Sequence, residues 1–130
     1  EGTQASFLNW VVNSLREGKE INVVNDQWNN PTWTNSLAVV VKRAIDSRLT
    51  GIAHWGDKDW ISRFDFALKI ANIFKLEQKL IKPINTDELK QVAPRPLKGG
   101  LKTEYVQKEL NLEPPPLEES LKAIKARLES

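Results

Sequence analysis

The sequence lacks cysteine and methionine altogether and holds one histidine among its 130 residues. Without cysteine, disulfide bonds and thiolate metal sites are excluded, and one histidine leaves no material for a histidine-based metal site or a catalytic triad. No apolar run has membrane-spanning length and no signal-peptide pattern occurs. We therefore expect no metal and no membrane partner, and a cytoplasmic location.

Charge of one sign is also scarce, because 19 Lys and Arg nearly balance 17 Asp and Glu. The five tryptophans occur without a recognised nucleic-acid motif, so we expect no nucleic-acid partner. Positive side chains do gather between residues 79 and 108, where seven Lys and Arg face three acids. Such a segment suits phosphate groups, although an ordinary solvated surface has the same composition.

The absence of methionine means that the chain does not begin at an initiator residue, and we expect it to be a piece of a longer protein. Its length and a hydrophobic content of 40% predict a single region over residues 1–130 with a real core.

Apolar periodicity predicts helices that alternate with a few short strands, which is the α/β class. The predicted helices cover residues 7–17, 34–47, 62–74, 86–92, 103–111 and 117–129. The predicted strands cover residues 21–24, 52–55 and 80–84, and a proline-rich spacer covers 112–116. The strands are too few and too short for a complete sheet, which indicates that they join strands elsewhere.

Polar residues mark the helix starts. Thr34 or Asn35 is positioned to cap the second helix, and Ser62 with Asp65 fits a capping pattern. Asp57 and Asp59 lack the spacing of a calcium loop, so they also read as turn and cap residues.

Glycine is present at only six positions, none of them in a Gly-x-Gly-x-x-Gly loop that could cradle a dinucleotide pyrophosphate. The one tyrosine, Tyr105, is followed four residues later by Glu109, so no Tyr-x-x-x-Lys pair exists. We therefore expect neither a bound cofactor nor catalytic residues in this chain.

The best site candidate is the polar loop from Asp26 to Trp33. Gln27, Trp28 and Asn29 offer amides that match hydroxyls or base edges and an indole that can cover a ring. The alternative is that they are surface residues, and that Trp33 fills the core.

Arg95 is the second candidate. It stands between Pro94 and Pro96, which hold the backbone extended. A guanidinium group is suited to bidentate phosphate recognition, and the alternative is a surface ion pair.

Several blocks in this order and spacing resemble the C-terminal, substrate-binding half of a dTDP-4-dehydrorhamnose reductase, an extended short-chain dehydrogenase. The blocks are Phe7-Leu8, Val23 to Gln27 with Pro31-Thr32, Gly51 to His54, Ser62 with Phe66-Ala67, and Arg95-Pro96. The chain departs from the family at Ser6, where asparagine is usual.

The resemblance implies the C-terminal portion of an NAD(P)-binding Rossmann-like enzyme. Residues 51–56 would be a strand of the parent's Rossmann sheet, while 21–24 and 80–84 would form a small lid sheet. Gln27 and Asn29 would border a nucleotide-sugar cleft, Trp28 would cover a ring, and Arg95 would face the diphosphate.

By the same resemblance, the full-length parent would use NADPH or NADH to reduce a 4-keto deoxysugar nucleotide, as in rhamnose biosynthesis. Its N-terminal Rossmann half would be the partner of this chain, and a homodimer is compatible with it. The alternative is a non-catalytic, reductase-like regulatory or protein-interaction subunit. A third reading is a stand-alone carbohydrate- or nucleotide-binding module. If the Rossmann half is absent, apolar faces should be exposed.

Overall fold

The computed structural model describes residues 6–90 and 92–130. Its helices and strands alternate in the order α1 (Phe7–Arg16), β1 (Ile21–Val24), β2 (Trp28–Asn29), α2 (Thr34–Asp46), β3 (Ile61–Ser62), α3 (Arg63–Phe74), β4 (Ile81–Ile84), α4 (Thr86–Leu89), α5 (Glu104–Leu110) and α6 (Leu117–Leu128). A single 3-10 turn, η1 (Gln78–Leu80), precedes β4. The α/β class with few short strands is confirmed. No helix in this part of the chain is long and apolar enough to cross a membrane.

The strands form two separate two-stranded sheets. β1 and β4 run parallel, with Ile21 opposite Ile81 and Val24 opposite Ile84, which confirms the pairing expected for the small sheet. β2 and β3 run antiparallel, with Trp28 opposite Ser62.

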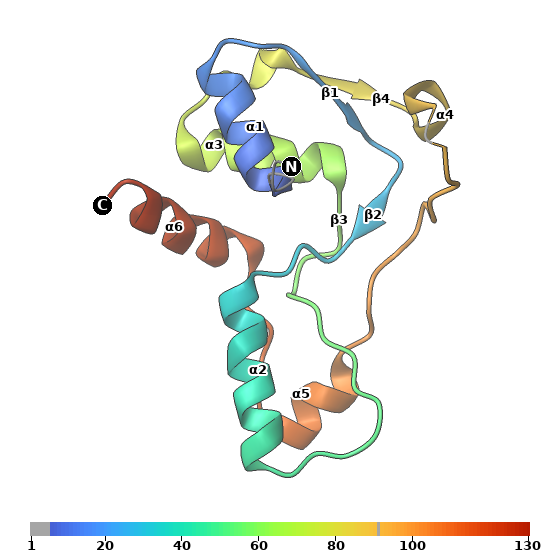
Figure 1. Ribbon diagram of the computed structural model, residues 1–130, viewed down its shortest axis with the longest axis vertical. Helices are drawn as coiled ribbons and strands as arrows, with labels where there is room; N and C mark the ends of the chain where they lie inside the picture. Colours follow the sequence, from blue (N-terminus) through green and yellow to red (C-terminus); the bar gives the residue numbers. More distant parts are fainter. Residues whose placement is uncertain (1–5, 91) are drawn as a thin grey trace.

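The molecule is elongated (Figure 1). Two clusters of buried apolar side chains hold it together. The larger cluster joins α1, α3 and α6 to the β1–β4 sheet, and Val11, Ile70 and Leu121 are almost fully buried in it. The smaller cluster packs Val40 of α2 against two residues of α5, Val106 and Leu110, at the opposite end. The second cluster is small, so it leaves most apolar side chains of α2 uncovered.

The apolar residues of α2 have the spacing of a buried helical face, but most of them are exposed. Val40 is buried, but Leu37, Val41 and Ile45 are 42%, 51% and 71% exposed. The face has helical spacing, yet no described element covers it. The apolar surface expected if the Rossmann half is absent is therefore present on α2.

Residues 51–56 form no strand in this chain, although Ile52 to Trp55 was predicted as one. Ile52 is 86% exposed. A strand is defined by its hydrogen-bonded neighbour, and no described strand lies beside this segment. Its place in a parent's sheet stays a prediction.

Three aspartates between residues 57 and 65 each bind the start of a different helix. Asp57, which is 1% exposed, accepts hydrogen bonds from the Trp33 amide at 3.0 Å and the Ser36 hydroxyl at 2.6 Å, at the start of α2. Asp59 accepts one from the Leu117 amide at 2.7 Å, at the start of α6.

The third aspartate, Asp65, lies in the first turn of α3. Its amide donates to the Ser62 hydroxyl at 3.0 Å, and that hydroxyl donates back to the Asp65 carboxylate at 2.6 Å. The cap and turn roles of all three aspartates are confirmed. The cap predicted at Thr34 or Asn35 is not: Trp33 occupies the cap position and Asp57 reaches across from another loop.

We predict that Asp57→Ala lowers the free energy of unfolding by about 2 kcal/mol, because it removes a buried carboxylate that accepts from the partly buried Trp33 amide and Ser36 hydroxyl. The measurement is urea unfolding followed by circular dichroism. Asp46→Ala is the matched control: its carboxylate is exposed in a pair with Lys42, so its loss should cost below about 0.5 kcal/mol. Equal effects of the two substitutions would contradict the role of Asp57.

Candidate functional site

A hollow of about 430 Å³ lies where α1, β1, the start of α3, α4 and the segment of Arg95 meet. Two of the four predicted site residues, Gln27 and Arg95, line it together although they are far apart in the sequence. The complete lining is Phe7, Trp10, Asn22, Val23, Val24, Gln27, Arg63, Leu89 and Arg95. This set contains two arginines and no carboxylate, so a bound anion would meet no like charge in the wall.

Gln27 is held rigidly at the edge of this hollow. It is 7% exposed, and its Nε2 donates to the Thr86 hydroxyl at 3.0 Å. The main-chain carbonyl oxygen of Gln27 accepts a hydrogen bond from the Arg63 main-chain amide at 3.0 Å. The loop that carries Gln27 is thus tied both to α4 and to the start of α3.

Asp26 fixes Thr86 in turn. Its carboxylate accepts from the Thr86 hydroxyl at 2.7 Å and from the Thr86 amide at 3.1 Å. The hydroxyl contact, followed by the amide contact, lowers the pKa of Asp26 below its ordinary value of 3.8. The ionised form of Asp26 is therefore the one that holds α4 beside Gln27.

Trp28 and Asn29 do not line this hollow. Trp28 instead connects three segments through its main chain. Its amide donates to the Leu97 carbonyl at 2.7 Å, and its carbonyl accepts from the Gly99 amide at 2.9 Å. Asn29 lies opposite Ile61 in the β2–β3 pair. The structural contribution of these residues is to hold the segment that follows Arg95.

Trp60 and Asn30 hold the same segment through their side chains. The Trp60 indole packs against that of Trp28 with ring centroids 4.9 Å apart, and its Nε1 donates to the Gly99 carbonyl at 2.7 Å. The Asn30 side-chain oxygen accepts from the Leu101 amide at 3.0 Å. Because residues 97–101 are anchored at several points, the position of Arg95 just before them is constrained.

Arg63 and Trp10 are lining residues that the sequence reasoning did not identify. Arg63 is the first residue of α3, directly after the capping Ser62. The recognised cap already located residue 63 at a helix start. The sequence carried no sign, however, that this helix start lies next to Gln27, because that is a tertiary contact.

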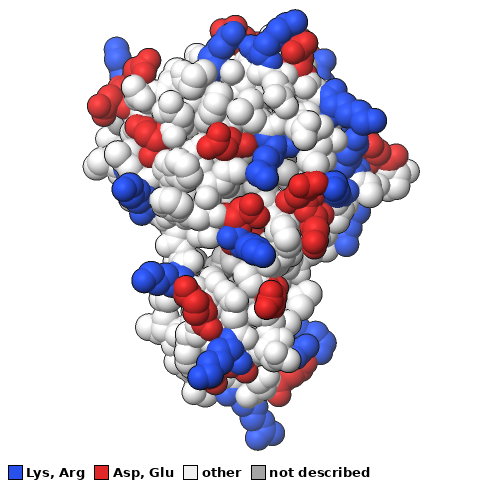
Figure 2. All heavy atoms as spheres, turned by 180° about the vertical axis from the view of Figure 1, so that it is seen from behind, with Lys and Arg blue, Asp and Glu red and all other residues white. Residues whose placement is uncertain are grey.

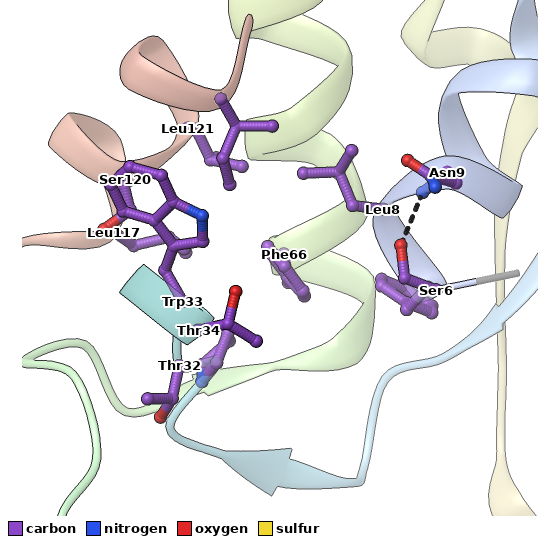
Figure 3. Close-up of a pocket in the computed structure, with 13 residues that line it drawn as sticks. Ser6, Leu8, Asn9, Thr32, Trp33, Thr34, Phe66, Leu117, Ser120 and Leu121 are labelled. Carbon is purple, nitrogen blue, oxygen red and sulfur yellow. Dashed lines mark hydrogen bonds between the residues drawn. The ribbon is translucent and has the colours of Figure 1, made fainter. Parts of the chain in front are cut away.

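A second hollow, of about 370 Å³, lies between α1, α3, α6 and residues 31–34 (Figure 3). Leu8, Phe66 and Leu121 form its apolar walls, and Trp33 closes one side. The Arg127 guanidinium lies over the Trp33 ring at 5.1 Å from its centroid. No charged residue in the described part of the chain lines this hollow, so those residues do not complement a phosphate group.

The face of the molecule that Figure 2 shows has no cluster of side chains of one charge. There, positive and negative side chains alternate over both ends of the molecule. Exposed lysines also form pairs with nearby acids, as Lys82 does with Glu20 at 3.7 Å. The two arginines that line the first hollow make it the candidate place for an anion.

The described residues do not fit a nicotinamide dinucleotide. The residues that precede the four longer helices are Ser6, Trp33, Ser62 and Pro116, and none is a glycine. A pyrophosphate needs a glycine-rich loop at a helix start so that the backbone can approach it closely. No chemical step through such a cofactor can be assigned to these residues.

Comparison with protein families matches residues 1–130 to the family described as RmlD substrate binding domain. Comparison with curated proteins finds no match. The family match covers the whole chain and confirms the resemblance that the sequence motifs indicated.

The chain is similar to solved structures of dTDP-4-dehydrorhamnose reductases. With that of Clostridium acetobutylicum it shares 30% identity at a TM-score of 0.88, over 100% of this chain and 46% of that one. With that of Bacillus anthracis, in complex with NADP, it shares 27% identity at a TM-score of 0.87, over 97% of this chain and 44% of that one. With that of Yersinia enterocolitica it shares 25% identity at a TM-score of 0.78, over 93% of this chain and 42% of that one. The chain thus spans less than half the length of these relatives.

We predict that Gly100→Ala destabilises the protein by about 3 kcal/mol. Gly100 has a φ of +122°, and an added Cβ would lie 2.7 Å from the Asn30 side-chain oxygen and 2.9 Å from the Trp60 ring. Gly51→Ala is the matched control, because Gly51 also has a positive φ, +86°, but open space around it. Its cost should be about 1 kcal/mol. Thermal unfolding compares the two, and a smaller loss for Gly100→Ala would show that residues 97–101 are not tightly held.

A second prediction concerns pH. Because the folded pKa of Asp26 lies below 3.8, its contribution to stability is present above the unfolded pKa and is lost as pH falls through the folded value. In Asp26→Asn this part is missing at every pH. Unfolding free energies measured from neutral pH to below 3.8 should therefore converge between the two proteins as pH falls. A constant difference would contradict the assignment.

Proposed function

The chain belongs to the RmlD substrate-binding-domain family, and from this premise we propose that it forms the nucleotide-sugar-binding portion of a dTDP-4-dehydrorhamnose reductase-like enzyme. The full-length parent would reduce the 4-keto group of a deoxysugar nucleotide. This chain would bind and orient that substrate, while the reducing machinery lies in an N-terminal Rossmann half.

The observation that carries the proposal is the meeting of Gln27 and Arg95 in one hollow without a carboxylate in its wall. The Arg95 guanidinium would neutralise the diphosphate with paired hydrogen bonds. The Gln27 amide, already oriented by Thr86, would border the sugar or base. Trp28 and Asn29 remain in the proposal as part of this loop, with Trp28 holding the segment next to Arg95 through its main chain.

The hydride would come from NADPH or NADH bound to the Rossmann half. The NADP complex of the Bacillus anthracis relative supports this source. In the proposal, the uncovered face of α2 packs on that half, and residues 51–56 add a strand to its sheet. Residues 51–54 and most apolar residues of α2 are exposed here, which agrees with surfaces made for a partner. A cytoplasmic location and a homodimer of the parent remain expectations.

The alternative function is a non-catalytic regulatory or interaction subunit that uses the same fold. The exposed apolar residues of α2 favour it as well, since they would suit any protein partner. A Tyr-x-x-x-Lys pair in the sequence upstream of this chain would decide for the enzyme, and its loss would decide for the regulator.

We predict that Arg95→Ala weakens the binding of dTDP- and UDP-sugars about tenfold, because a charge-assisted hydrogen bond to phosphate is lost. Isothermal titration calorimetry on the 130-residue chain is the measurement. Lys98→Ala is the matched control: it removes one positive charge from the same segment but lies outside the lining of the hollow, so its affinity should stay unchanged.

Two results would count against the proposal. If Arg95→Ala binds as tightly as the unaltered chain, Arg95 is not part of the site. If the folded chain binds no nucleotide sugar, the substrate-binding role itself is refuted.

A further inference from the structure

Arg63 is the feature of the hollow that the proposed function leaves without a task. It lines the same hollow as Arg95, and among the described residues neither guanidinium forms an ion pair. The hollow therefore has two positive charges at its wall that no described carboxylate neutralises. Positive charge is therefore concentrated at this hollow.

Arg63 is also held in position before any ligand arrives. Its amide donates to the Gln27 carbonyl at 3.0 Å, which fixes the backbone at the start of α3. Its guanidinium lies over the Phe7 ring at 5.5 Å from the centroid. Phe7 itself is braced by Phe66, with ring centroids 5.3 Å apart. Stacking on an aromatic face orients a guanidinium group and leaves its N–H donors at the edge free to bind an anion.

We propose that Arg63 is a second diphosphate-binding residue, which acts together with Arg95 and is positioned by the ring of Phe7. The inference rests on the proposed function, since it assigns the ligand of the same hollow more closely. A diphosphate has two adjacent phosphoryl groups, each with its own negative charge. One arginine satisfies one group, and two arginines on separate segments satisfy both.

The assignment also explains a selectivity that Arg95 alone does not provide. A monophosphate can be bound by either arginine, but only a diphosphate spans both. The hollow should therefore prefer nucleoside diphosphates over monophosphates, and this preference should depend on Arg63. Phe7 is a positioning residue here, because it acts on the ligand through the guanidinium that it supports.

The test is calorimetric titration of dTDP and of dTMP into the 130-residue chain and its variants. Arg63→Ala should weaken dTDP binding about tenfold and change dTMP binding far less. Phe7→Leu keeps an apolar side chain but removes the aromatic face, and should weaken dTDP binding roughly threefold. Arg16→Ala is the matched control, because it removes one positive charge at the far end of α1, outside the hollow.

The possible results separate this inference from the proposed function. If Arg95→Ala loses dTDP affinity and Arg63→Ala does not, the inference is wrong and the proposed function stands. If Arg63→Ala and Arg16→Ala lose affinity equally, the effect is one of overall charge and the inference is again wrong. If the unaltered chain binds no nucleotide, both are wrong. Arg63→Gln, measured alongside, supplies the same comparison should Arg63→Ala fail to give the native circular dichroism spectrum.

Discussion

Carboxylates on one short segment organise most of this molecule. Asp57 and Asp59 accept from amides at the starts of α2 and α6, and Asp65 accepts from the hydroxyl of Ser62, which caps α3. A helix start has unpaired amides and a partial positive charge, so a carboxylate there is stabilising. Because the three aspartates are neighbours in the sequence, the three helix starts must also be neighbours in space. This constraint joins the larger apolar cluster to the end of the molecule that α2 and α5 form.

The site follows from the same segment. Ser62, which caps α3, also pairs with Trp28 in the β2–β3 ladder, and Trp28 holds Leu97 and Gly99 through its main chain. The start of α3, the polar loop of Gln27 and the chain around Arg95 are thereby drawn to one place. Bringing together positions so far apart in the sequence lowers the conformational entropy of the chain, and the packing of the whole fold offsets this loss. Arg63 belongs to this site for the same reason, since it directly follows Ser62.

In the proposed function, this chain binds the substrate and a separate Rossmann half supplies the reducing machinery. The described residues offer cations, an amide and aromatic rings at one hollow, but no glycine-rich helix start for a dinucleotide. The chain also spans less than half of the reductases that it resembles. Most apolar residues of α2 remain exposed, and residues 51–56 have no neighbouring strand among the described residues. These features agree with a substrate-binding unit whose remaining surface is made for a partner.

Local structure and the available side-chain chemistry could be predicted from the sequence alone. Helical periodicity located α1, α3 and α6, the Ser62–Asp65 pattern located a cap, and Gln27 and Arg95 were identifiable from their residue types and neighbours. These are short-range properties, decided by side-chain spacing and backbone restriction. The tertiary structure alone decided that Arg63 lies beside Gln27, that Trp28 supports the chain after Arg95, that Asp57 serves α2 in place of Thr34, and that the apolar face of α2 stays uncovered. Each of these depends on contacts between distant segments, and the pattern of one segment does not specify which other segment it meets.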